Sequence, residues 1–187
     1  MEEKSFSRHE VMMAGIGGMG VLMAGKILAL AALEEYGHVS WLPSYGVEKR
    51  GGLCECTVIF SDKEISSPLI DQAQTMVVFA GNQFKDFEPR VRPGGIMLVD
   101  SAGLESGQGR TDYTMVKVPG MEVAHSMGEP QLNNLILLGA YVGATDTIPG
   151  PVVERELEKR LGADKSVRER NRRAFEQGIE LGSKTGQ

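Results

Sequence analysis

The fold is decided by residues 10–42, which read EVMMAGIGGMGVLMAGKILALAALEEYGHVSWL. Residues 10–14 form a short apolar run that predicts a buried strand, and a glycine cluster follows it. Residues 21–36 are apolar on nearly every face, as in a helix that is buried on most sides. Gly37 stands where helices commonly end, and residues 38–42 predict a second strand. Strand, glycine turn, helix and strand together predict a βαβ opening.

The rest of the chain continues this alternation. Further strands are predicted over residues 53–60, 75–80, 96–100 and 113–118, and helices over 84–90, 131–142, 151–161 and 166–181. Continuous apolar strands are typical of parallel strands that are covered on both faces. The pattern therefore predicts an α/β fold, namely a three-layer α/β/α Rossmann-like domain with a largely parallel sheet. With 187 residues, the chain is expected to form one domain over residues 1–187.

Composition excludes several classes of function. The net charge of −5 argues against a general surface for nucleic acid, which needs a basic face. No apolar run approaches the length of about 18 residues that spans a membrane. The first ten residues are polar and lack the apolar core of a secretory signal, so a cytoplasmic location is expected. Cys54 and Cys56 are poorly placed for a disulfide with each other. We interpret them as buried apolar thiols, with a metal or redox role as the alternative.

The glycine cluster fits the pattern G-x-G-x-x-G over residues 15–20. Glycines allow a tight turn, and the helix N-terminus that follows offers unpaired N–H groups to a phosphate. Binding of a dinucleotide would also need an acidic residue at the end of the second strand, and residues 39–43 contain none. A second interpretation is that the glycines only let helix and strand pack closely. A phosphate-bearing ligand remains the favoured hypothesis.

The segment from Pro43 to Gly52 is the more informative one and is predicted to be a loop. It leaves the carboxyl end of the second strand, where ligands bind in open parallel sheets. It supplies hydroxyl groups, an acid at Glu48 and a fixed cation at Arg50, which can hold a phosphate with two parallel hydrogen bonds. An ion pair between Glu48 and Arg50 is the structural alternative, and both interpretations can hold together.

The chain resembles the gamma domain of the pyruvate, 2-oxoglutarate and ketoisovalerate ferredoxin oxidoreductases. The resemblance is strongest over residues 15–21, 43–52 and 61–68, and continues in residues 134–140 and 171–178. The segment Pro-Ser-Tyr-Gly through Arg-Gly-Gly is its most specific part. The family usually has glutamine where Met19 stands and often proline where Val47 stands. Met19 removes a polar side chain from the glycine loop but leaves its backbone groups in place.

The resemblance implies a role in the oxidative decarboxylation of a 2-oxoacid to an acyl-CoA. The partners implied are alpha and beta subunits, a delta subunit where there is one, and ferredoxin indirectly. Thiamine diphosphate, magnesium and iron–sulfur clusters are expected on those partners, because two cysteines cannot ligate a four-iron cluster. No cofactor, metal or catalytic residue is expected on this chain alone. Coenzyme A is the shared substrate, and its expected contacts are Gly15, Gly17, Gly18, Met19, Gly20, Ser44, Tyr45, Gly46, Glu48, Arg50, Gly51 and Gly52.

Two other functions stay open at this point. One is a stand-alone reductase that binds NAD(P), and the other is a scaffold that only holds partner subunits together. His38 and His125 have no neighbouring set of ligands in the sequence and are interpreted as structural or surface residues.

Overall fold

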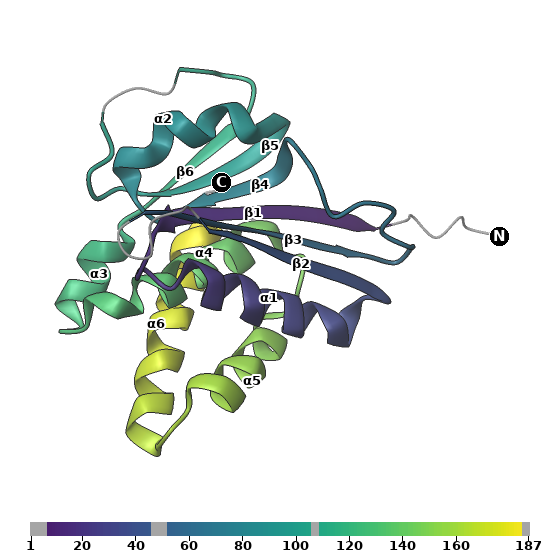
Figure 1. Ribbon diagram of the computed structural model, residues 1–187. Helices are drawn as coiled ribbons and strands as arrows, with labels where there is room; N and C mark the ends of the chain where they lie inside the picture. Colours follow the sequence, from purple (N-terminus) through teal and green to yellow (C-terminus); the bar gives the residue numbers. More distant parts are fainter. Residues whose placement is uncertain (1–6, 46–51, 106–108, 185–187) are drawn as a thin grey trace.

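The computed structural model describes residues 7–45, 52–105 and 109–184 and forms a six-stranded sheet in the order β2-β3-β1-β4-β5-β6 (Figure 1). The strands are β1 (Arg8–Ile16), β2 (His38–Tyr45), β3 (Leu53–Ser61), β4 (Ala73–Val78), β5 (Val91–Asp100) and β6 (Thr114–Val118). The helices are α1 (Val21–Glu35), α2 (Phe84–Phe87), α3 (Gly120–Ser126), α4 (Asn133–Thr145), α5 (Gly150–Leu161) and α6 (Lys165–Ser183).

The sheet is largely parallel, as the sequence predicts, with one exception. β1 pairs parallel with β4, β4 with β5 and β5 with β6. β3 runs antiparallel to both of its neighbours, β1 and β2. The expected βαβ opening therefore forms with β1 and β2 in the same direction, but β3 is inserted between them. The carboxyl ends of β1 and β2 consequently lie at the same edge of the sheet.

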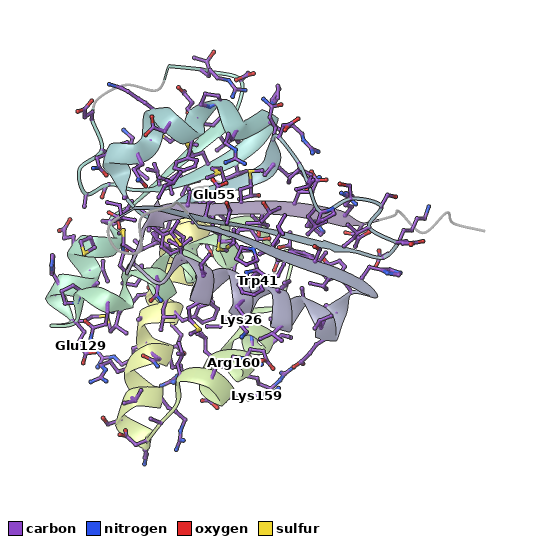
Figure 2. The ribbon with its side chains drawn as sticks, viewed as in Figure 1. Lys26, Trp41, Glu55, Glu129, Lys159 and Arg160 are labelled. Atoms are coloured by element: carbon purple, nitrogen blue, oxygen red, sulfur yellow. The ribbon has the colours of Figure 1, made fainter. Side chains whose placement is uncertain are left out.

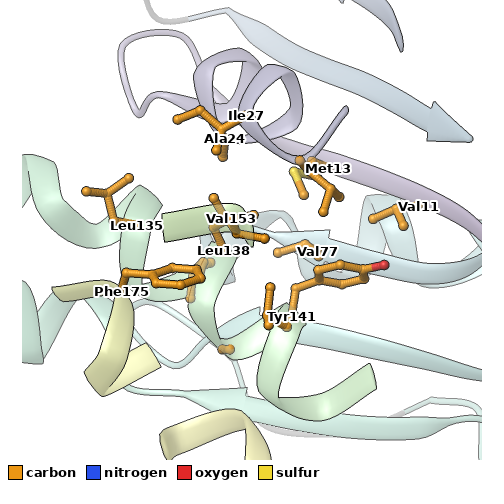
Figure 3. Packing of buried hydrophobic residues seen from close by; sticks show 14 of the residues in the cluster. Val11, Met13, Ala24, Ile27, Val77, Leu135, Leu138, Tyr141, Val153 and Phe175 are labelled. Atoms are coloured by element: carbon orange, nitrogen blue, oxygen red, sulfur yellow. The ribbon is translucent and has the colours of Figure 1, made fainter. Parts of the chain in front are cut away.

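Three layers are present, and they are unequal. Figure 1 shows α1, α4, α5 and α6 on one face of the sheet and only the short α2 with its adjoining turns on the other. The larger core contains Met13, Ile27, Leu138, Tyr141 and Phe175, all fully buried (Figure 3). A smaller cluster lies under α2, around Phe84 and Phe87. The sheet is thus covered on both faces, which explains its continuous apolar strands.

Two expectations about local structure need correction. The segment 43–52 is not loop from its start, because β2 continues through Pro43 to Tyr45. Proline is tolerated there because β2 is an edge strand and needs partners on one side only. Helix α3 was not predicted. It has seven residues, and its start is held by a tertiary contact, in which the Met121 N–H donates to Asp100 Oδ2 at 2.9 Å.

The helices α4 and α6 cross at a contact made of glycines. A β-carbon at Gly178 would collide with the carbonyl oxygen of Ile136, and one at Gly139 would collide with that of Phe175. A β-carbon at Gly182 would likewise collide with the carbonyl oxygen of Ala140. The two backbones therefore approach more closely than any larger residue would permit. This contact fixes α4 against α6.

His9 predicts a pH dependence of stability. Its ring packs against Phe60 with centroids 5.1 Å apart, and its Nε2 lies 2.7 Å from Ser7 Oγ. Burial lowers the pKa of His9 below its usual value of 6.5, and Asp62 opposes this only in part. The unfolded chain therefore binds the proton more tightly, and stability falls as the pH drops below about 6.5. We expect His9→Gln to flatten the dependence between pH 7 and pH 5 in denaturant titrations. The substitution His38→Gln, at an exposed histidine, should leave the pH dependence of stability unchanged. If stability varied with pH equally in both variants, the role of His9 would be contradicted.

Candidate functional site

The glycine loop, residues 15–20, links the carboxyl end of β1 to the N-terminus of α1. Its glycines have different structural roles. Gly18 and Gly20 adopt left-handed backbone angles, with φ of 101° and 78°. At Gly15, a β-carbon would lie 2.9 Å from both Phe79 Cβ and Val21 Cγ2, so this position is needed for close packing. At Gly18, no described residue lies within 4 Å of such a carbon. The packing interpretation thus applies to Gly15, whereas the described part of the chain leaves space around Gly18.

Gly20 is the N-cap of α1, and no side chain caps this helix end. The Gly20 carbonyl accepts the first helical hydrogen bond, from the Ala24 N–H at 3.0 Å. The first N–H groups of a helix lack partners within it and carry a partial positive charge. The loop therefore presents backbone donors to an anion, as the sequence pattern indicates.

The second segment ends beside the glycine loop and begins one strand away from it. Ser44 is exposed near the end of β2, and Tyr45 is the last residue of that strand. Where the chain returns, the Gly52 carbonyl accepts a hydrogen bond from the Gly17 N–H at 2.9 Å. Gly46, Glu48, Arg50 and Gly51 lie outside the described residues, and so does the expected ion pair between Glu48 and Arg50. The structure therefore brings the C-terminal end of this segment to the glycine loop, and its N-terminal end to the same edge of the sheet.

Two asparagines at the start of α4 complete this edge, and sequence reasoning gave them no role. The Asn134 side chain packs directly on Gly20, so that a β-carbon at Gly20 would lie 3.0 Å from Asn134 Cγ. Asn133 is 3% exposed, and its amide makes no well-formed hydrogen bond within the described residues. In the sequence, the only indication of a role for these asparagines is that two polar residues precede an apolar helix. The same pattern is typical of ordinary helix starts.

Asp100 is the last residue of β5 and is buried behind Asn133. Its carboxylate accepts hydrogen bonds from the Ala102 N–H at 2.8 Å and the Met121 N–H at 2.9 Å. Burial raises the pKa of Asp100, while these two N–H groups and the nearby Asn133 amide act in the opposite direction. The carboxylate thus fixes α3 and the turn after β5 at the same edge as the glycine loop.

The cysteines lie on one face of β3, as expected. Cys54 is partly buried and Cys56 is buried. Burial raises the pKa of the Cys56 thiol to about 12, and the nearby Trp41 indole N–H opposes this only in part. A thiol with this pKa is protonated at neutral pH and is a poor nucleophile or metal ligand. Among the described residues, no three His, Cys, Asp or Glu side chains gather in a way that could hold a metal ion.

The topology gives a second argument against a dinucleotide site. In dinucleotide-binding folds, the second strand of the chain lies beside the first, and its terminal acid reaches the ribose. Here β3 separates β1 from β2. A residue at the end of β2 is therefore displaced by one strand from the glycine loop. The arrangement fits an anionic ligand that contacts both loops better than it fits NAD.

Comparison with known proteins assigns the family. The sequence model of the family described as pyruvate ferredoxin/flavodoxin oxidoreductase matches residues 10–181, which is most of the chain. The chain belongs to this family. A family member from Methanothermobacter marburgensis, ketoisovalerate oxidoreductase subunit VorA, is 36% identical over 76% of the chain. The chain spans about 30% of the length of that VorA relative. The 2-oxoglutarate synthase subunit KorC of Methanocaldococcus jannaschii is 29% identical over 93% of the chain and 94% of its own length.

Solved structures of family members have the same fold. A keto/oxoacid ferredoxin oxidoreductase gamma subunit from Geobacter sulfurreducens superimposes with a TM-score of 0.83 and 25% identity, over 96% of this chain and 98% of its own. The 2-oxoglutarate:ferredoxin oxidoreductase of Magnetococcus marinus, solved with 2-oxoglutarate, coenzyme A and succinyl-CoA bound, gives a TM-score of 0.87 at 21% identity. That match covers 95% of this chain and 31% of the Magnetococcus chain. In the described part of this family member, no helix is both long and apolar enough to cross a membrane.

Proposed function

We propose that the chain is the gamma subunit of a multi-subunit 2-oxoacid:ferredoxin oxidoreductase, an enzyme that converts a 2-oxoacid to an acyl-CoA. The observation that supports this most strongly is its similarity to KorC and to the Geobacter gamma subunit over nearly the full length of each. Longer relatives such as VorA contain the same domain as part of a larger chain. A domain that is fused to other domains in some relatives is expected to bind the corresponding separate subunits in others.

Within this complex, the chain's own contribution is a coenzyme A site at the carboxyl edge of β1 and β2. The uncapped N-terminus of α1 at Gly20 and the hydrogen bond between Gly17 and Gly52 support it, because they join two phosphate-compatible loops. Arg50 belongs to the second segment in sequence, outside the described residues, and is proposed to be nearest a phosphate. That the Magnetococcus oxidoreductase was solved with coenzyme A bound supports the choice of ligand.

The redox cofactors of such an enzyme do not fit this chain. Cys54 and Cys56 are its only cysteines, and the thiol of Cys56 is buried with a raised pKa. An iron–sulfur cluster held by four thiolates has no ligand set here. Thiamine diphosphate, magnesium and the clusters are therefore assigned to the alpha, beta or delta partners, which pass electrons to ferredoxin. The cytoplasmic location inferred from the sequence stays a prediction.

Arg50→Ala tests the proposed contact with coenzyme A. Loss of a charge-assisted hydrogen bond of about 1.5–3 kcal/mol should raise the apparent KM for coenzyme A in the reconstituted enzyme by a factor of roughly 10 to 100. The KM for the 2-oxoacid should not change. Arg173→Ala removes an exposed arginine on α6 and is the matched control. An unchanged KM for coenzyme A in Arg50→Ala would exclude this contact, and weakened assembly with normal KM would favour the scaffold.

A further inference from the structure

A basic groove lies between α1 and α5, outside the loops described so far. It has a volume of about 400 Å³ and is lined by Met23, Lys26, Lys159 and Arg160. Figure 2 shows Lys26 of α1 facing Lys159 and Arg160 of α5. Three of the four lining residues are cations and none is acidic. A groove of this size and charge is suited to an anionic small molecule.

Lys159 and Arg160 both have acidic partners. Glu34 of α1, whose side chain is 34% exposed, lies 3.5 Å from Lys159 Nζ. Glu156 has a side chain only 9% exposed and contacts Lys159 Nζ at 2.6 Å and Arg160 Nε at 3.7 Å. The side chains of Lys159 and Arg160 remain 59% and 39% exposed. The carboxylate thus holds both cations in place from the protein side while their outer faces stay open to the groove.

Lys26 differs from the other two cations in its contacts. Within the described part of the chain, no carboxylate forms an ion pair with it, and its Nζ lies 5.9 Å from the centre of the Trp41 ring. Met23, which is 40% exposed, adds an apolar wall to the groove. Two cations held by Glu156, a third cation without a carboxylate partner among the described residues, and an apolar wall suit a phosphorylated ligand.

The groove and the glycine loop share helix α1. Lys26 comes six residues after Gly20, which corresponds to about 9 Å along a helix. A ligand that carries two separated phosphate groups can therefore contact both places. Coenzyme A has this chemistry, because its diphosphate and the 3′-phosphate of its ribose are distinct groups.

We propose that the basic groove binds the 3′-phosphate of coenzyme A while the glycine loop contacts the diphosphate. This inference rests on the proposed function. It assigns roles to Lys26, Lys159 and Arg160, which neither the sequence motifs nor the family resemblance singled out. Contact with the phosphate is electrostatic, so its strength falls as salt is raised.

The test compares coenzyme A with 3′-dephospho-coenzyme A in the reconstituted enzyme. Lys26→Met and Arg160→Gln should each raise the KM for coenzyme A about tenfold, the effect expected from loss of one charged contact. The KM for the dephospho form should be unaffected in both variants. Lys117→Met, on the strand at the far edge of the sheet, is the control for loss of a surface charge. Equal changes for both ligands, or no change, would overturn the assignment.

A second measurement separates this inference from the proposed function. Calorimetry with the full chain alone should show that adenosine 3′,5′-bisphosphate binds and that Lys26→Met weakens its binding about tenfold, whether or not the complex is active. If the complex uses coenzyme A normally but the bisphosphate does not bind, the groove assignment fails alone. If Lys26→Glu impairs co-purification of partner subunits without changing the KM for coenzyme A, the groove is a docking surface for an acidic partner, and the assignment also fails.

Discussion

Gly178→Val should destabilise the chain by about 3 kcal/mol, at the upper end of what overpacking usually costs. The added β-carbon would overlap the carbonyl oxygen of Ile136 and lie 3.0 Å from the Ala140 nitrogen. These are backbone atoms of α4, so the collision is relieved only if the two helices move apart. Replacing a helical glycine by valine gains a few tenths of a kcal/mol in helix propensity, which is too little to compensate.

Denaturant titration of the purified full chain measures this effect. Gly37→Val is the matched control, since a β-carbon at Gly37 has no neighbour within 4 Å among the residues that the structure describes. We expect the control to remain within about 0.5 kcal/mol of the parent chain, as is usual for surface substitutions. A loss for Gly178→Val that is no larger than that of the control would show that α4 and α6 do not cross in this way.

Gly20→Ala should raise the KM for coenzyme A about tenfold or more, because the α1 N-terminus would no longer hold its position. Two effects act together at this residue. Its φ of 78° costs a residue with a β-carbon roughly 1–2 kcal/mol, and the new methyl group would collide with Asn134. Moving the N–H groups by a fraction of an ångström weakens hydrogen bonds to a phosphate, which depend steeply on geometry.

Gly18→Ala separates the two effects. Gly18 also has a positive φ, at 101°, but a β-carbon there meets no described residue within 4 Å. It should cost stability while changing the KM for coenzyme A less than Gly20→Ala does. If Gly20→Ala lowers stability and leaves the KM unchanged, the glycine loop serves packing only, which is the structural alternative considered for the sequence motif.

Local patterns in the sequence were sufficient for most of the fold. The apolar run 10–14, the glycine cluster and the helix 21–36 predicted β1, the turn and α1, because each depends on neighbours along the chain. The insertion of β3 between β1 and β2 was not predictable, since strand pairing depends on contacts distant in sequence. Helix α3 escaped prediction for a similar reason, because it is short and Asp100 holds its start.

The candidate site was partly predictable. The two loops follow strands that end at one edge of the sheet, and the hydrogen bond from Gly17 to Gly52 joins them there. Asn134 was missed, because its contact with Gly20 connects parts of the chain far apart in sequence. The basic groove was missed because Lys26 lies on a helix that the sequence described only as apolar, and its facing cations lie on α5. Contact with coenzyme A stays a prediction for every residue of both loops, and Gly46, Glu48, Arg50 and Gly51 also lie outside the described residues.

The most direct test of the proposed function is anaerobic affinity purification of the tagged full chain from its native host, followed by an assay of electron transfer to a viologen dye. We expect the chain to elute with subunits that hold thiamine diphosphate and iron–sulfur clusters. The preparation should reduce the dye only when a 2-oxoacid and coenzyme A are both supplied, and it should form the acyl-CoA. A chain that elutes alone and binds NAD(P)H, or a complex whose dye reduction requires no 2-oxoacid, would contradict the proposal.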